Sequence, residues 1–79
     1  MSERELRCRV SKGMFSDERA VTCATKAGEV SVFVPQDTVH ENNGSSTVRV
    51  KVFHQGTAAW AVLPTEDQTV IPIEDSQLQ

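Results

Sequence analysis

Two cysteines and two histidines are the side chains of this sequence that first suggest chemistry. Cys8, Cys23, His40 and His54 are the ligand types of a structural zinc site. Such sites usually take two ligands from a tight knuckle such as C-x-x-C, and no two of these four residues lie that close in the sequence. We therefore expect no bound metal and two reduced thiols that behave as small hydrophobic side chains.

Motifs for catalysis and for nucleotide binding are absent from the sequence. It contains no G-x-S-x-G elbow, no P-loop and no G-x-G-x-x-G. The adjacent carboxylates of residues 66–67 and 74–75 could in principle act as acid and base, but exposed acidic turns explain them more simply. The sequence predicts neither an enzyme nor a cofactor.

The stretch VRVKVFHQG, residues 48–56, has the alternation of a β-strand with one buried face. Its three valines point to one side, and Arg49, Lys51 and Phe53 point to the other. An aromatic ring flanked by cations can stack on a nucleobase or on another ring. The alternative is a solvated face whose Phe53 packs under a loop, and that interpretation is favoured because single apolar residues are common on surfaces.

The segment LRCRV, residues 6–10, alternates in the same way and directs Arg7 and Arg9 outward. If this strand lies beside residues 47–54, the basic side chains of both strands form one stripe around Phe53. The stripe would be the binding surface of a barrel for RNA or single-stranded nucleic acid.

Three further apolar side chains are candidates for binding. Met14 and Phe15 interrupt the otherwise polar loop SKGMFSD, residues 11–17, where they would contact a partner or, as we favour, plug an open end of a barrel. Trp60 alternates with alanines at 59 and 61. It therefore lies either outside near Phe53 or inside as a core anchor, and the sequence leaves both alternatives open.

The glycines separate segments rich in β-branched residues, as expected where tight turns require positive φ. We expect strands at 6–10, 19–25, 29–34, 47–54, 57–63 and 69–73, with single helical turns at 35–39 and 74–78. No segment repeats apolar residues at helical spacing over three turns, so no long helix is expected.

At 79 residues the chain has room for one domain. Five or six short antiparallel strands would hide an apolar face by curling into a small, partly open barrel, with an SH3-like topology as first choice and an OB-like one as second. We expect residues 1–4 and 74–79 to be frayed and residues 41–46 (ENNGSS) to form a mobile loop. The predicted core consists of Val10, Val30, Val32, Val48, Val50, Val52, Ala61 and Leu63.

The formal net charge of −3 disfavours a dedicated nucleic-acid binder. No apolar run is long enough to cross a bilayer, and Met1 to Glu5 lacks the basic start and apolar core of a secretory signal, so we expect a cytoplasmic protein. The leading hypothesis is a small protein-interaction module or accessory subunit without catalytic activity, and the alternative is a weak RNA- or single-strand-binding barrel. The candidate binding residues are Arg7, Arg9, Met14, Phe15, Arg49, Lys51, Phe53 and Trp60.

Overall fold

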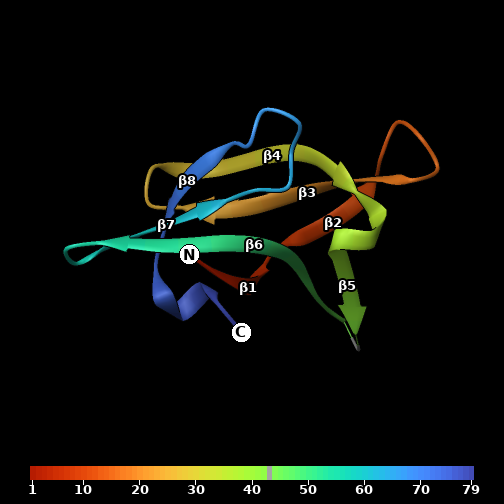
Figure 1. Cartoon of the computed structure of the whole chain (residues 1–79). Coiled ribbons are helices and arrows are strands. Elements are labelled where there is room, and N and C mark those ends of the chain that lie inside the picture. The colour runs from red at the N-terminus through yellow and green to blue at the C-terminus, as the bar shows by residue number, and fades with distance from the viewer. Residues whose placement is uncertain (43) are drawn as a thin grey trace.

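The computed structural model describes residues 1–42 and 44–79, which form eight strands and two single turns of 3₁₀ helix (Figure 1). The strands are β1 (Ser2–Arg7), β2 (Arg9–Lys12), β3 (Glu18–Thr25), β4 (Gly28–Pro35), β5 (Val39–Asn42), β6 (Ser45–Gln55), β7 (Ala58–Val62) and β8 (Val70–Ile73). The 3₁₀ turns η1 (Gln36–Thr38) and η2 (Asp75–Gln77) lie within the two segments expected to wind once.

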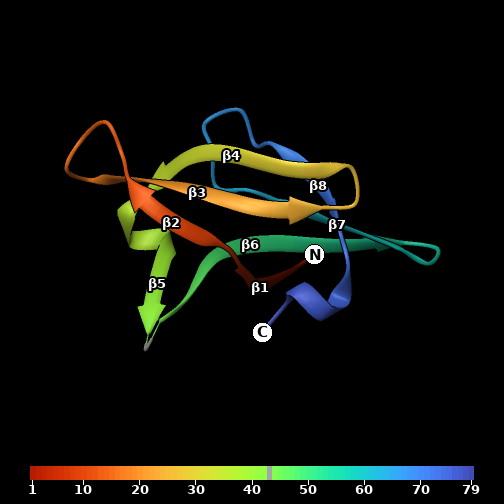
Figure 2. The same cartoon turned by 180° about the vertical axis from the view of Figure 1, so that it is seen from behind.

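The strands form two antiparallel sheets that pack face to face. The larger sheet has the order β1-β6-β7-β8, with β5 also paired to β6, and the smaller sheet has the order β2-β3-β4. The long strand β6 is the centre of the larger sheet because it pairs with three other strands. The two views of Figures 1 and 2 show β3 and β4 layered over the β6–β7 hairpin. The all-β prediction is confirmed.

The single strand expected at residues 6–10 is wrong, because the chain changes sheets at Cys8. Residues before Cys8 pair with β6, whereas Arg9 to Lys12 pair with β3. The backbone N–H of Cys8 donates to Ser46 O at 3.0 Å, so the break remains hydrogen-bonded. A chain this short must bend its strands to bring two apolar faces together, and the bend at Cys8 joins the sheets along one side.

The predicted barrel is also wrong in its closure and in its number of strands. The bend at Cys8 joins the sheets on one side, but on the other side β4 and β8 do not pair with each other. Pro72 in β8 has no N–H to donate to a ladder, which disfavours a further strand there. The result is an open two-sheet sandwich. The strand β5 was not expected from the sequence, since its residues VHEN lack a clear alternation.

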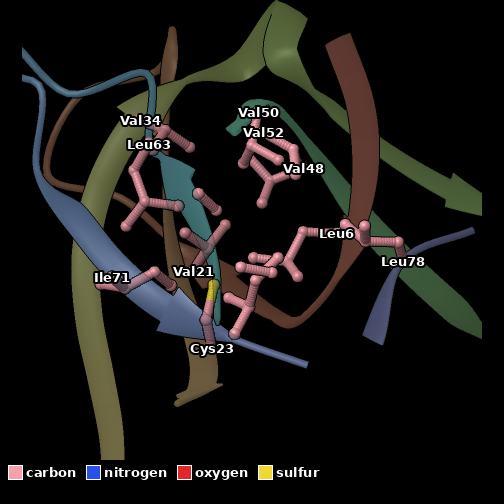
Figure 3. Close-up of a cluster of buried hydrophobic side chains, with 13 residues drawn as sticks. Leu6, Val21, Cys23, Val34, Val48, Val50, Val52, Leu63, Ile71 and Leu78 are labelled. Atoms are coloured by element: carbon pink, nitrogen blue, oxygen red, sulfur yellow. The ribbon is translucent and has the colours of Figure 1, made fainter. Parts of the chain in front are cut away.

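The core lies between the sheets and draws apolar side chains from both (Figure 3). Of the residues predicted to be buried, the three valines of β6, Ala61 and Leu63 are buried. Val10, Val30 and Val32 pack against the core but are only half-buried, because the edge strands β2 and β4 leave one side of these valines open; on β4 only Val34 is fully covered. The buried set is Leu6, Val21, Cys23, Val34, Val48, Val50, Val52, Ala59, Ala61, Leu63, Ile71, Ile73 and Leu78.

Both chain ends, which the sequence predicts to fray, pair with the larger sheet. Ser2 already opposes Val52. At the other end Leu78 is buried and bridges Leu6, and the N–H of Gln79 donates to Glu5 O at 2.9 Å. Apolar contact of the two leucines explains the docked terminus. Of the predicted loop 41–46, residues 41–42 lie in β5 and 45–46 in β6, and Asn43 lies outside the described residues.

Truncating one central valine should test the assignment of faces. Val50 is buried in β6, and Val50→Ala should lower the free energy of unfolding by about 1 to 3 kcal/mol, since it leaves a cavity. The matched change Val70→Ala, at a side chain that is 48% exposed, should cost no more than about 0.5 kcal/mol. Urea denaturation of both variants measures the difference. Equal losses would contradict the assignment.

Candidate interaction surface

The face of the larger sheet that points away from the core is the candidate functional surface, and we call it the outer face. Strand alternation that buries the valines of β6 turns every second residue outward, and neighbouring strands follow the same register. The outer face consists of Glu3, Glu5 and Arg7 of β1, Arg49, Lys51 and Phe53 of β6, Trp60 and Val62 of β7, and Val70 and Pro72 of β8.

Phe53 and Trp60 are directly opposite each other on β6 and β7 and form an aromatic pair. Their ring centroids are 6.5 Å apart and the ring planes differ by 14°. Both residues are half-buried, while Ala59 and Ala61 on either side of Trp60 are buried in the core. Of the two alternatives for Trp60, the structure therefore shows the outward one.

The indole nitrogen of Trp60 is buried and has no hydrogen-bond partner among the described residues. A buried N–H without an acceptor costs free energy in a folded protein. The indole therefore contributes apolar contact area to the outer face, and its N–H contributes no hydrogen bond among the described residues.

Apolar side chains extend the aromatic pair across the sheet. Pro72 opposes Trp60 on β8, and the next row of the ladder brings Val62 opposite Val70. Val70 is 48% exposed, which is high for a β-branched residue in a strand. The sequence hinted at Phe53 and Trp60 alone, because the pairing of β7 with β8 decides that Val70 and Pro72 join them.

The predicted stripe of four bases is not formed. In the ladder between β1 and β6, Glu5 opposes Arg49 and Glu3 opposes Lys51, so each base of β6 faces a carboxylate. Arg49 also donates to the backbone carbonyl of Asp37 at 3.1 Å. The outer face thus has charges of both signs. The sequence contained a sign of these carboxylates, since the alternation of residues 6–10 extends back to Glu5 and Glu3, which share the outward face of Arg7.

Arg7 and Arg9 are separated by the bend at Cys8. Arg7 opposes Thr47 at the end of the outer face, and its guanidinium donates to Ser76 O at 3.0 Å. Arg9 lies in the other sheet and forms an ion pair of 3.1 Å with Glu29. Arg9 is therefore not part of the same surface as Arg49 and Lys51.

A groove of about 320 Å³ lies beside the aromatic pair. Its floor includes Lys51 and Val62, which form the row of the ladder next to Phe53 and Trp60. Its walls include Glu3, Arg49 and the loop that joins β7 to β8. The groove thus places apolar side chains and charges of both signs next to the two aromatic rings.

The loop of residues 63–69 that walls this groove is held by internal hydrogen bonds. The hydroxyls of Thr65 and Thr69 both lie 2.9 Å from Asp67 Oδ1, and the N–H of Thr69 donates to Thr65 Oγ1 at 2.9 Å. Gln68 has a φ of 53°, a left-handed conformation that is uncommon for residues other than glycine. These bonds hold the pKa of the Asp67 carboxyl below its usual value of 3.8, through Thr65 first and then Thr69.

Met14 and Phe15 form a second, separate apolar spot. They lie in the loop between β2 and β3, at exposed fractions of 74% and 67%. The favoured prediction that they plug an open end of the barrel is wrong, because the sandwich core closes without them. Nearby Lys12, Arg19 and Glu41 line a shallow groove of about 630 Å³ with them. The structure does not bring this loop onto the outer face.

The cysteines and histidines do not gather at one point. Cys8 and Cys23 are free and contact each other across the start of the β2–β3 ladder. The hydrogen bond to Cys23 raises the pKa of the Cys8 thiol, and burial raises it further. His40 lies 3.2 Å from Glu5 Oε1, and His54 lies 3.1 Å from Asp75 Oδ1. Among residues 1–42 and 44–79, no three metal-binding side chains cluster.

Comparisons with protein-family models, with curated proteins and with solved structures find no match to this chain. Within the part of the chain that the structure describes, both helices are single turns, and neither has the length or the apolar character to span a bilayer. Because none of these comparisons finds a match, the outer face is interpreted from its own residues.

The hydrogen bonds of Asp67, in the loop that walls the groove, lead to a prediction about the pKa of its carboxyl. Thr69→Val removes one of the two hydroxyl donors to Asp67, so the pKa of that carboxyl should rise toward 3.8. A depressed pKa stabilises the fold above the unfolded value, and this contribution is lost as the pH falls through the folded value. Carboxyl NMR titration measures the change. Thr38→Val, which removes a hydroxyl bound to Pro35 O, is the control and should leave Asp67 unchanged.

Proposed function

We propose that the protein is a small interaction module or accessory subunit that binds another protein through its outer face and has no catalytic activity of its own. The observation that carries this proposal is the Phe53–Trp60 pair, which lies half-buried on the open side of a sheet. Stacked aromatic rings offer a large apolar area that loses little conformational freedom on binding. Aromatic residues are enriched at the centres of protein interfaces for this reason.

The neighbours of the aromatic pair support a protein partner. Val62, Val70 and Pro72 extend the apolar area, and the bases of β6 lie at its border opposite carboxylates of β1. An apolar centre with a rim of mixed charge is the usual anatomy of a protein interface, in which rim charges adjust orientation and association rate.

The same neighbours weigh against the alternative, a weak RNA- or single-strand-binding surface. Nucleic-acid affinity comes largely from cations that neutralise phosphates. Here Glu3 and Glu5 oppose Lys51 and Arg49, and Arg9 is engaged with Glu29 in the other sheet. The two carboxylates would repel a phosphate backbone that approached the aromatic pair.

The absence of catalytic activity is part of the proposal. Two titratable side chains near the outer face have partners that suit structural roles, since His40 lies beside Glu5 and Asp67 accepts hydrogen bonds from two threonine hydroxyls. The first contact joins β5 to β1 and the second fixes the loop between β7 and β8, so both are explained by the fold without a role in catalysis. We further propose a cytoplasmic location, as expected from the sequence.

For the topology, an SH3-like relationship remains our first choice and an OB-like one our second. Two three-stranded meanders, β2-β3-β4 and β6-β7-β8, support the first choice. OB folds are Greek-key barrels, in which the strand order departs from a simple meander.

The three phenylalanines of the chain lie on three different surfaces, which allows a matched test. Phe53 is on the outer face, Phe15 is in the β2–β3 loop, and Phe33 is on the exposed side of the smaller sheet. Phe53→Ala should weaken partner binding by about 1 to 2 kcal/mol, because it removes half of the aromatic pair. Phe15→Ala and Phe33→Ala should have no such effect.

The partner is first identified by affinity capture from the native host and then purified, and its affinity for each folded variant is measured by calorimetry. Loss of affinity with Phe15→Ala alone would move the site to the β2–β3 loop. Unfolding of Phe53→Ala would show that the ring belongs to the core, which contradicts the proposed role of the outer face.

The alternative function is tested by titrating labelled single-stranded RNA at low and moderate salt. We expect weak binding that does not depend on Phe53. Tight binding with a steep salt dependence, abolished by Lys51→Glu and Phe53→Ala, would overturn the protein-binding proposal in favour of the RNA-binding one.

A further inference from the structure

The free edge of β4 differs from the other sheet edges of this protein. Open edges invite pairing with other chains, and proteins usually protect them with charges, prolines or short strands. Strand β1 has charged residues along its length and contacts the C-terminal residues, β2 and β5 are four residues long, and β8 contains Pro72. None of these devices protects the middle of β4, and the β7–β8 loop lies only near its end, where Pro64 to Glu66 share a pocket with Phe33, Val34 and Pro35.

Strand β4 is eight residues long and reads GEVSVFVP. It lies at the end of the β2-β3-β4 sheet. Among the described residues, no backbone hydrogen bond from outside that ladder reaches residues 29–34. Its one charged side chain, Glu29, is at the beginning of the strand and pairs with Arg9. Phe33 is 48% exposed, and Val30 and Val32 are half-buried at the rim of the core.

We propose that β4 pairs antiparallel with β4 of a second copy of this chain, so that two smaller sheets join into one continuous sheet. The copies would be related by a twofold axis beside Val32. This interaction is separate from the outer face, since it uses the other sheet. It would cover the half-buried valines and satisfy the free backbone groups of the edge.

The alternation of β4 restricts how two copies can pair. Opposed residues in an antiparallel pair share one face of the sheet, so the core valines must oppose valines for both cores to lie on the same side. An axis beside Val32 meets this condition, because Val30 then opposes Val34 of the second copy.

The same axis gives compatible neighbours on the solvent face, where Ser31 opposes Phe33 of the second copy. It keeps the two Glu29 side chains at opposite ends of the paired strands, each near its own Arg9. An axis beside Ser31 would bring Glu29 against Phe33, and an axis beside Phe33 would bring Glu29 against Asp37. A carboxylate against an aromatic ring or a second carboxylate is less favourable than either neighbour in the proposed register.

Paired charges at positions 31 and 33 test both the edge and the register. The variant S31K/F33K places lysine opposite lysine twice, whereas S31E/F33K and the reversed pair S31K/F33E place opposite charges together. All three variants lose the 2.8 Å hydrogen bond between the hydroxyls of Ser31 and Thr22. The resulting loss of monomer stability should therefore be the same in each variant. Circular dichroism and thermal melting confirm that each variant is folded.

Sedimentation equilibrium over a concentration series measures the association. We expect the wild-type chain to approach twice its monomer mass of 8.7 kDa. We expect S31K/F33K to dimerise about tenfold more weakly than the two oppositely charged variants, since like charges directly opposite are destabilising. Amide hydrogen exchange of the wild type should slow in residues 30–34 as concentration rises.

A wild-type chain that stays monomeric at every concentration would overturn the proposal, and so would equal dimerisation of all three charge variants. The test of β4 pairing does not depend on the outer-face proposal. If Phe53→Ala fails to weaken partner binding, the outer-face proposal fails, while the dimer should be unchanged in that variant. Dimers lost in Phe53→Ala but retained in S31K/F33K would place the contact on the outer face and contradict the pairing of β4.

Discussion

The burial of three alternating valines in β6 is the constraint on which the rest of the structure depends. Val48, Val50 and Val52 can enter the core only if the intervening residues point outward. Because β6 pairs with β1, β5 and β7, its register also decides which residues of those strands face solvent. The aromatic pair on the outer face is therefore a consequence of how the core is filled.

The size of the chain explains why its sheets stay open. A domain of 79 residues has little apolar surface to bury, and a sandwich of two sheets already covers most of it. The bend at Cys8 joins the sheets on one side, and the free edges lie on the other. An open sandwich keeps the outer sides of both sheets and the edges of its outermost strands accessible to solvent.

The outer face and the edge strand β4 differ in how their charged side chains are arranged. On the outer face, carboxylates of β1 oppose the bases of β6, so the aromatic pair has a border of both signs. On the smaller sheet, the ion pair of Arg9 with Glu29 lies near the beginning of β4 and leaves the rest of that strand uncharged. Exposed ion pairs contribute little to stability, and their effect here is to define where apolar contact is available.

The sequence by itself determined the all-β class, the inward valines of β6, both single turns and the outward position of Arg49 and Lys51, because these follow from alternation and turn residues within one segment. It could not determine the bend at Cys8, the opposition of Glu5 to Arg49, the docking of Leu78 on Leu6, or the choice between the two orientations of Trp60. Those features depend on which strands become neighbours. Which strands become neighbours is decided only when the apolar faces of the two sheets pack together. Local periodicity cannot decide it, since it is the same for a flat, a bent or a closed sheet.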